Sequence, residues 1–415
     1  MKMAKVVIGA NFGDEGKGLM TDYFGANSKN PIVIRFNGGA QAGHTVVTTQ
    51  GTRHVFSHFG AGSLLGVPTY LSQFFAVNPL IFFKEWEELK LCFCRKKNPV
   101  FPKVMVSENC MVTTPYDMLI NQVVESQRGA GRHGSCGLGF YETILRNQKT
   151  EYQLTVQELL DLKRKGSEGR YKIRKKLDFI RQSYVKQRFC QLGITMVDDN
   201  LLSVLQSDGL LEDSLEQMRQ FVDEVRVVNF ETAVKDFDTL LFEGAQGLML
   251  HQSYRYFPHV TPSNTGMENV VELLTPLKSE ISEIEAVYVT RTYLTRHGAG
   301  PLPGELKEKP YENIVDLTNQ PNEYQGKLRF AYLDVTMLKE NVDNDLERVK
   351  NSGFSIKPAL AITCLNQPQG NIVFIKNKRK QSATKKTFLQ VLQQVTGIEE
   401  LYVSWGENRN CVDRY

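Results

Sequence analysis

The sequence predicts an α/β fold in which helices flank a central, mostly parallel sheet. Short apolar or β-branched runs alternate with helical stretches through the first third of the chain, and glycine-rich turns follow several of these runs. The first run, residues 6–8 (VVI), leads into a glycine-rich turn at 9–18 and then into a helix from about Leu19. Free backbone N–H groups and a helix dipole converge at such a turn, so the opening stretch predicts a phosphate site.

The remaining elements follow the same pattern along the chain. We expect further strands at residues 32–35, 69–71, 104–106, 239–243, 286–290, 359–363, 371–375 and 401–403. Apolar residues at helical spacing predict helices at residues 79–91, 115–127 and 381–395. Residues 155–231 are mostly helical in pattern, which predicts a helical subregion at about 150–235 inside one domain spanning 1–415.

Composition excludes several classes of protein. The 415 residues are 41% hydrophobic and 23% charged, with a formal net charge of +4, which suits a globular protein with phosphate- or carboxylate-bearing substrates. The basic stretch at 163–188 lacks an aromatic platform, so we expect a solvated helix face and no nucleic-acid partner. The seven cysteines form no C-x-x-C pair, and no apolar run reaches the roughly 18 residues that span a bilayer. We therefore expect no membrane partner and a reducing, cytoplasmic setting.

The opening turn, GDEGKG at residues 13–18, resembles a P-loop without matching it. Gly16 and Gly18 let the backbone approach phosphates, and Lys17 supplies a cation. Asp14 replaces the usual hydroxyl as a candidate Mg²⁺ ligand. A second glycine turn follows the strand at 32–35 and carries Gln41 and His44. If these two strands are neighbours, both turns share one crevice, and His44 becomes a candidate catalytic residue facing the first loop.

These two loops resemble the opening motifs of the adenylosuccinate synthetase family, GDEGKG and GGHNAGHT. The resemblance continues in the same order along almost the whole chain. The corresponding segments are FEGAQG at 242–247, VTPSNT at 260–265, TRHGAGPLPGE at 295–305 (family TRVGAGPFPTE), RFAYLD at 329–334 and SWGENR at 404–409.

The resemblance implies a ligase that joins aspartate to C6 of IMP with GTP and Mg²⁺. The C6 oxygen is first phosphorylated, and the aspartate amine then displaces phosphate. Asp14 would remove the N1 proton of the purine and contact Mg²⁺, with the Gly43 carbonyl completing the metal shell. His44 would act as the acid at the transferring phosphoryl group, and Lys17 would neutralise charge.

The resemblance also implies binding roles and a homodimer. Residues expected to bind the nucleoside triphosphate or its phosphates are Gly13, Glu15, Gly16, Gly18, Thr45, Asn366, Ser404 and Gly406. Those expected to bind the purine monophosphate are Gln41, Ser135, Gln246, Thr261 and Arg146, the last reaching the nucleotide of the other subunit. Arg296, Lys327 and Arg329 are expected to bind aspartate.

Departures from the family motifs leave the substrates open. Gln41 replaces a family Asn, and residues 133–135 read HGS where the family has TTG. Residues 323–329 (EYQGKLR) lack the arginine-rich pattern of the family, which leaves the amine donor less defined than the purine. The family TKLD becomes TCLN at 363–366, so Asn366 replaces the Asp that reads guanine. An amide both donates and accepts, so it can tolerate adenine, and the phosphoryl donor is GTP or ATP.

Three functions remain open from the sequence. The first is ligation of aspartate to IMP. The second is the same chemistry on dGMP, as in related phage enzymes, many of which replace the loop aspartate that this chain keeps as Asp14. The third is a catalytically silent nucleotide sensor, which would have no need of Asp14 and His44 together.

Overall fold

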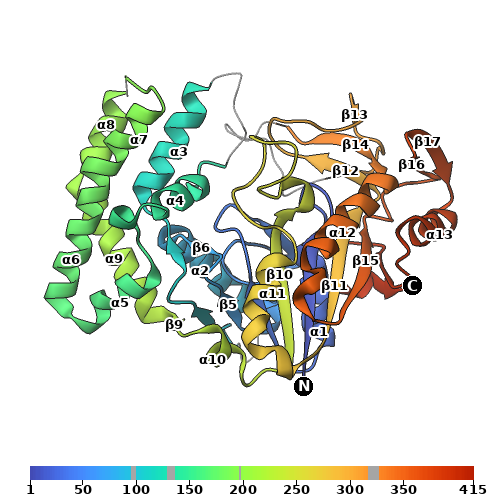
Figure 1. Cartoon of the computed structure of the whole chain (residues 1–415), viewed down its shortest axis with the longest axis horizontal. Coiled ribbons are helices and arrows are strands. Elements are labelled where there is room, and N and C mark those ends of the chain that lie inside the picture. The colour runs from blue at the N-terminus through green and yellow to red at the C-terminus, as the bar shows by residue number, and fades with distance from the viewer. Residues whose placement is uncertain (95–99, 129–135, 196–197, 316–326) are drawn as a thin grey trace.

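The computed structural model describes residues 1–94, 100–128, 136–195, 198–315 and 327–415. A ten-stranded sheet runs through the middle of the molecule, and all its pairings are parallel except the last, between β18 and β19 (Figure 1). Its strands, in spatial order, are β19 (Val412–Arg414), β18 (Leu401–Ser404), β15 (Ile356–Thr363), β11 (Ile281–Arg291), β1 (Lys2–Gly9), β10 (Thr239–Gly247), β2 (Pro31–Arg35), β5 (Thr69–Leu71), β7 (Val104–Val106) and β9 (Arg226–Val227). The predicted mostly parallel α/β sheet is confirmed.

Successive side chains of the central strands point to opposite faces of the sheet and are apolar on both, which explains why helices cover both faces. In β1, Val6 and Ile8 face one apolar cluster, which contains residues of α10–α13, whereas Val7 faces another that contains Leu19 and Phe24 of α1. Strands buried on both faces are nearly continuous apolar runs, which is why residues 239–243 were recognisable. The helices concerned are α1 (Lys17–Asn27), α10 (Phe230–Val234), α11 (Glu268–Leu274), α12 (Val335–Val349) and α13 (Lys385–Thr396).

The predicted helical subregion forms one end of the molecule (Figure 1). Its helices share an apolar cluster with α2 (Pro79–Phe93) and α3 (Pro115–Gln127), separate from the two clusters against the central strands. The helices are α5 (Val156–Arg164), α6 (Gly166–Phe179), α7 (Val185–Gln191), α8 (Asp199–Gln206) and α9 (Asp208–Glu224). Basic side chains of this region pair with neighbouring carboxylates, as Arg174 does with Glu212 at 2.6 Å. In the described part of the chain, no helix is long and apolar enough to cross a membrane.

A second, five-stranded sheet lies beyond the carboxyl ends of the central strands (Figure 1). It consists of β12 (Tyr293–Arg296), β13 (Glu305–Leu306), β14 (Arg329–Asp334), β16 (Ile372–Lys376) and β17 (Arg379–Ala383). The predicted helix at 381–395 is wrong at its start, because residues 379–383 pair with β16 and Thr384 caps α13 by accepting from the Thr387 N–H. Two smaller pairs join β3 (His44–Val47) to β4 (Arg53–Phe56) and β6 (Ala76–Val77) to β8 (Met111–Val112).

The first two strands, β1 and β2, are not neighbours in the sheet. Strand β10 lies between β1 and β2 and pairs with both in parallel. The loop at its carboxyl end therefore enters between the two predicted glycine turns. Three loops meet at this edge of the sheet, and the motif FEGAQG lies in the middle of the site.

Candidate active site

A cavity of about 720 Å³ opens where these loops meet. Loops after β1, β2, β10 and β12 form one wall of the cavity, and α3, α4 (Phe140–Asn147) and α7 form the other. The sequence-predicted site residues that line it are Gly13, Asp14, Lys17, Gln41, Gly43, His44, Gln246, Thr261 and Arg296.

Close backbone packing explains two of the glycines. A Cβ on Gly13, whose φ is +113°, would lie 2.8 Å from the backbone of Gln246. A Cβ on Gly18 would lie 2.7 Å from the carbonyl oxygen of Thr45. Glycine at these positions lets the first loop pack against the other two, so that their side chains reach one cavity.

The Glu15 side chain forms its hydrogen bonds within the first loop. Its buried carboxylate accepts hydrogen bonds from the Asn11 N–H at 2.9 Å, from Asn11 Nδ2 at 2.7 Å and from the Gly13 N–H at 3.2 Å. Burial raises the pKa of Glu15 to about 7, although Lys17 and these donors oppose the rise. The Glu15 side chain is therefore a structural part of the loop, which does not fit the predicted phosphate contact.

Lys17 begins α1 and lines the cavity with a buried side chain. Its ammonium donates to the Gly13 carbonyl. Burial lowers the pKa of Lys17, and the nearby carboxylates of Glu15 and Asp14 oppose that change. A cation so placed at a helix N-terminus can counter charge on a phosphoryl group.

His44 is held by a carboxylate that the sequence analysis did not single out. Its Nδ1 lies 2.7 Å from Oε1 of Glu243, in β10, and Oε2 of Glu243 accepts from the Ala61 N–H at 3.0 Å. Burial lowers the pKa of His44 to about 4, against the pull of Glu243. Although burial acts to raise the pKa of Glu243, His44 and Arg35 hold it below its usual value. A neutral imidazole that donates Nδ1–H to Glu243 has its Nε2 lone pair available to a ligand.

Asp14 is half-buried in the cavity, and its Oδ2 lies 3.2 Å from Nε2 of His297, which follows β12. One carboxylate and one backbone carbonyl, from Asp14 and Gly43, suit a Mg²⁺ ion that takes its other ligands from phosphates and water. The described residues contain no group of three or more His, Cys, Asp or Glu side chains able to hold a metal by themselves.

The predicted purine-binding side chains in the cavity carry polar atoms that nothing satisfies. Both amide atoms of Gln41, Oε1 of Gln246 and Oγ1 of Thr261 are buried and find no hydrogen-bond partner among the described residues. Gln246 also adopts a positive φ of 62°. Buried polar groups are ordinarily paired, so this set fits a polar ligand in the cavity.

Of the three residues expected to bind aspartate, one lines the cavity and two do not. Arg296 lines the cavity, donates to the carbonyls of Pro301 at 2.6 Å and His259 at 2.9 Å, and stacks 4.7 Å from the Phe12 ring centroid. Arg329 is occupied by Glu305 and by the carbonyls of Gly298 and Gly300, both at 2.9 Å. Lys327 is exposed and, like Arg329, is not among the residues that line the cavity.

Three residues expected to bind the donor nucleotide, Asn366, Ser404 and Gly406, are not among those that line the cavity. Asn366, exposed after β15, and Ser404, at the end of β18, are brought close because the Leu365 N–H donates to the Ser404 carbonyl at 3.1 Å. The Ser404 hydroxyl donates to the Gly406 carbonyl at 2.7 Å. A Cβ on Gly16 would lie 2.9 Å from Thr363, so this group adjoins the first loop on the side of β15.

The structure does not support Arg146 as a nucleotide-binding residue. Its side chain is fully buried and pairs with Asp117, Nε to Oδ1 at 2.9 Å. Its remaining nitrogens donate to the carbonyls of Tyr152 at 2.7 Å and Val112 at 2.6 Å. Every arm of the guanidinium is used inside the fold, so Arg146 is a structural residue. Ser135 lies outside the described residues.

Removing the Arg146 charge is expected to destabilise the protein. R146M leaves Asp117 buried and uncompensated, and we expect the free energy of unfolding to fall by about 3–5 kcal/mol. The control R174M removes a solvent-exposed partner of Glu212 and should leave the free energy of unfolding close to that of wild type. Urea denaturation measures both. Unchanged stability in R146M, together with weakened purine binding, would restore the nucleotide role.

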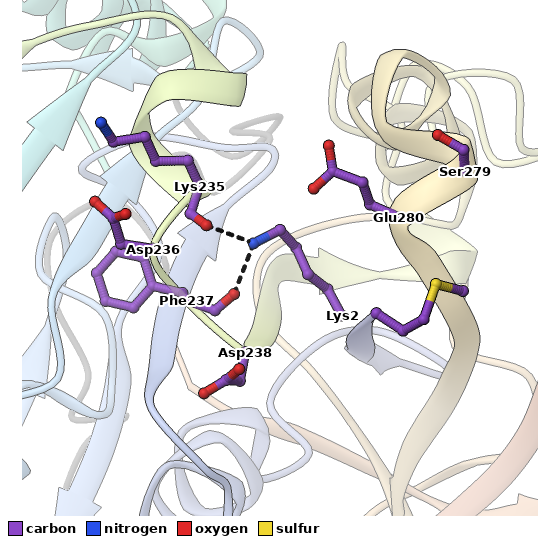
Figure 2. Close-up of a pocket in the computed structure, with 8 residues that line it drawn as sticks. Lys2, Lys235, Asp236, Phe237, Asp238, Ser279 and Glu280 are labelled. Atoms are coloured by element: carbon purple, nitrogen blue, oxygen red, sulfur yellow. Dashed lines mark hydrogen bonds between the residues drawn. The ribbon is translucent and has the colours of Figure 1, made fainter.

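A separate hollow of about 280 Å³ lies at the opposite, amino ends of β1, β10 and β11 (Figure 2). The Lys2 ammonium donates there to the carbonyls of Lys235 and Phe237, both at 2.8 Å, and of Val234 at 3.0 Å. The Lys2 ammonium thus fixes the segment that leads into β10. This hollow shares no residues with the cavity described above.

A parallel α/β sheet whose first loop resembles a P-loop, carries Asp14 and Lys17 and shares a cavity with the imidazole of His44 is typical of enzymes that transfer phosphoryl groups. Within that class, the chain belongs to the adenylosuccinate synthetase family, whose model matches residues 6–348. It is therefore a ligase.

Individual relatives agree with this assignment. The chain is 27% identical to the adenylosuccinate synthetase of Borrelia turicatae over 83% of this chain and 74% of that protein. It is 30% identical to that of Thermoplasma volcanium over 82% and 72%, respectively. The ligated enzyme of Plasmodium falciparum superposes with a TM-score of 0.71 at 18% identity, covering 99% of both chains. A cyanophage S-2L succinoaminodeoxyadenylate synthetase, bound to dGMP and dATP, superposes with a TM-score of 0.59 at 15% identity, covering 100% of this chain and 95% of that one.

Proposed function

We propose that this protein joins aspartate to C6 of a purine nucleoside monophosphate, IMP, while a nucleoside triphosphate is cleaved to the diphosphate and phosphate. The observation that carries the proposal is the shared cavity of Asp14, Lys17 and His44, whose wall also presents the unpaired atoms of Gln41 and Gln246.

The chain supplies the groups that each step needs. Asp14 takes the N1 proton, and the C6 oxygen then attacks the γ-phosphorus and releases the diphosphate. Lys17 counters charge on the phosphoryl group. His44, whose Nε2 is available to a ligand, takes up a proton when an anionic phosphate raises its pKa, and then donates to the leaving oxygen. The aspartate amine attacks C6, and phosphate leaves with the oxygen that began on the purine.

Asp14 and the Gly43 carbonyl, both from residues that line the cavity, would hold Mg²⁺, which would spread the charge of the nucleotide phosphates. We assign the aspartate carboxylates to the Arg296 end of the cavity. The Nε of Arg296 is buried and has no partner in the described part of the chain, whereas the guanidinium of Arg329 is already occupied. Lys327 remains a proposed contact from the exposed rim.

We assign the base of the phosphoryl donor to the group of Asn366, Ser404 and Gly406. A carboxylate at Asn366 would accept from the N1–H and amino group of guanine, whereas the amide tolerates both guanine and adenine. We expect N366D to raise the ratio of kcat/KM for GTP over ATP by about tenfold or more. N371D, which makes the same change at another exposed asparagine, is the control. An unchanged ratio in N366D would place the base elsewhere.

dGMP is the second candidate substrate, because the phage synthetase of the same fold binds dGMP and because Gln41 and Asn366 depart from the family motifs. The retained Asp14 favours IMP. Phosphate release with IMP or dGMP, each with aspartate and GTP or ATP, separates the two. No release with either purine would leave the silent nucleotide sensor as the best interpretation.

We further propose a homodimer and a cytoplasmic setting. The homodimer is proposed from the family resemblance, and sedimentation velocity of the full chain tests it. The cytoplasmic setting is compatible with seven free cysteines, all of which lie in the described part of the chain.

A further inference from the structure

His297 lies where the family motif quoted above, TRVGAGP, has valine, so this chain carries an imidazole where that motif has an apolar side chain. The residue follows β12 of the second sheet, whereas Asp14 follows β1 of the central sheet. The cavity is where these two loops face each other.

The His297 ring is polar but barely solvated. Its side chain is 17% exposed, and Nε2 lies 3.2 Å from Asp14 Oδ2. Neither ring nitrogen forms an aligned hydrogen bond with any described residue, and both are buried. Burying an imidazole without hydrogen bonds to its nitrogens costs free energy. We therefore expect one ring nitrogen to form an aligned hydrogen bond when substrate is bound.

Two arginines fix the loop that carries His297. Arg296 bonds the carbonyls of His259 and Pro301 and stacks on Phe12, two residues before Asp14. Arg329 donates to the carbonyls of Gly298 and Gly300. These contacts hold both ends of the loop, so the imidazole is positioned by the surrounding structure.

We propose that His297 is a positioning residue for the base of the reaction: its Nε2–H donates to Asp14 Oδ2 and directs Oδ1 at the N1 proton of the purine. The inference rests on the proposed function of Asp14. His297 itself takes no proton from the substrate. Its effect therefore passes through Asp14 and is absent when Asp14 cannot act as a base.

A set of variants tests this dependence. H297V removes the donor at similar volume, and H297N keeps an N–H donor. We expect H297V to lower kcat about tenfold or more while the KM for the purine monophosphate changes by less than about threefold, and H297N to recover most of the loss. In a D14N background, H297V should change the residual kcat by less than about twofold, because both changes remove one function. Full activity of H297V, a loss confined to KM, or additive losses in the double variant would each overturn the proposal.

A measurement without turnover separates this proposal from the proposed function. In the full-length protein labelled with ¹⁵N-histidine and bound to a purine monophosphate, the ring N–H signal that disappears in H297V should shift in D14N. An unaffected signal in D14N contradicts the His297–Asp14 bond even if the enzyme is active. If the signal shifts in D14N but the wild-type protein releases no phosphate, only the proposed function is contradicted.

Discussion

Asp14→Asn is expected to lower kcat by about 10³-fold while the protein keeps its fold. The change is isosteric, but the amide cannot accept the N1 proton, and positioned acid–base groups contribute about 10²–10⁴-fold to a rate. Asp14 is half-buried at the cavity, and its removal leaves the apolar core untouched. Phosphate release under saturating substrates measures the loss, and the thermal midpoint checks the fold.

The control for this variant is D236N, which neutralises an exposed aspartate at the opposite end of the sheet. It should leave kcat within about twofold of wild type, as expected for a surface change away from the site. D14N with more than a tenth of wild-type activity would show that another group removes the proton.

His44→Gln is expected to lower kcat by about 10²-fold or more, because glutamine cannot take up and deliver a proton at Nε2. E243Q should cost less, about tenfold, because it leaves the imidazole in place, although it removes the charge that sets the imidazole tautomer and that faces buried Arg35. The two variants measured together give a graded series. Equal losses in both would mean that the imidazole acts only while the Glu243 carboxylate holds it, and full activity of H44Q would exclude His44 as the acid.

The sheet was predictable because parallel strands buried on both faces have a strong local signature. β5 and β7 begin and end where the sequence predicts, and β10 extends the predicted 239–243. Strand order was not predictable from local patterns, because the insertion of β10 between β1 and β2 depends on contacts between residues more than two hundred positions apart. The strand β17 was missed because its exposed polar residues precede an amphipathic helix without a break.

The site likewise has a part that the sequence motifs predict and a part that depends on long-range contacts. Gln41, Gln246 and Thr261 share the cavity, as the motifs implied. Glu243 lies in the recognised FEGAQG motif, but only the strand order shows that it meets His44. His297 was visible as a departure from the family motif, although nothing local indicates that it faces Asp14. Arg146 shows the opposite error, because an arginine near a motif position carries no sign of its burial.

The central claim is that the purine oxygen is phosphorylated and leaves with phosphate. Purine monophosphate labelled with ¹⁸O at C6, incubated with aspartate, GTP or ATP and the full-length protein, tests this by mass spectrometry of the released phosphate. We expect one ¹⁸O in each phosphate and none in the purine product. Unlabelled phosphate would mean that the triphosphate is hydrolysed by water and would contradict the proposed reaction.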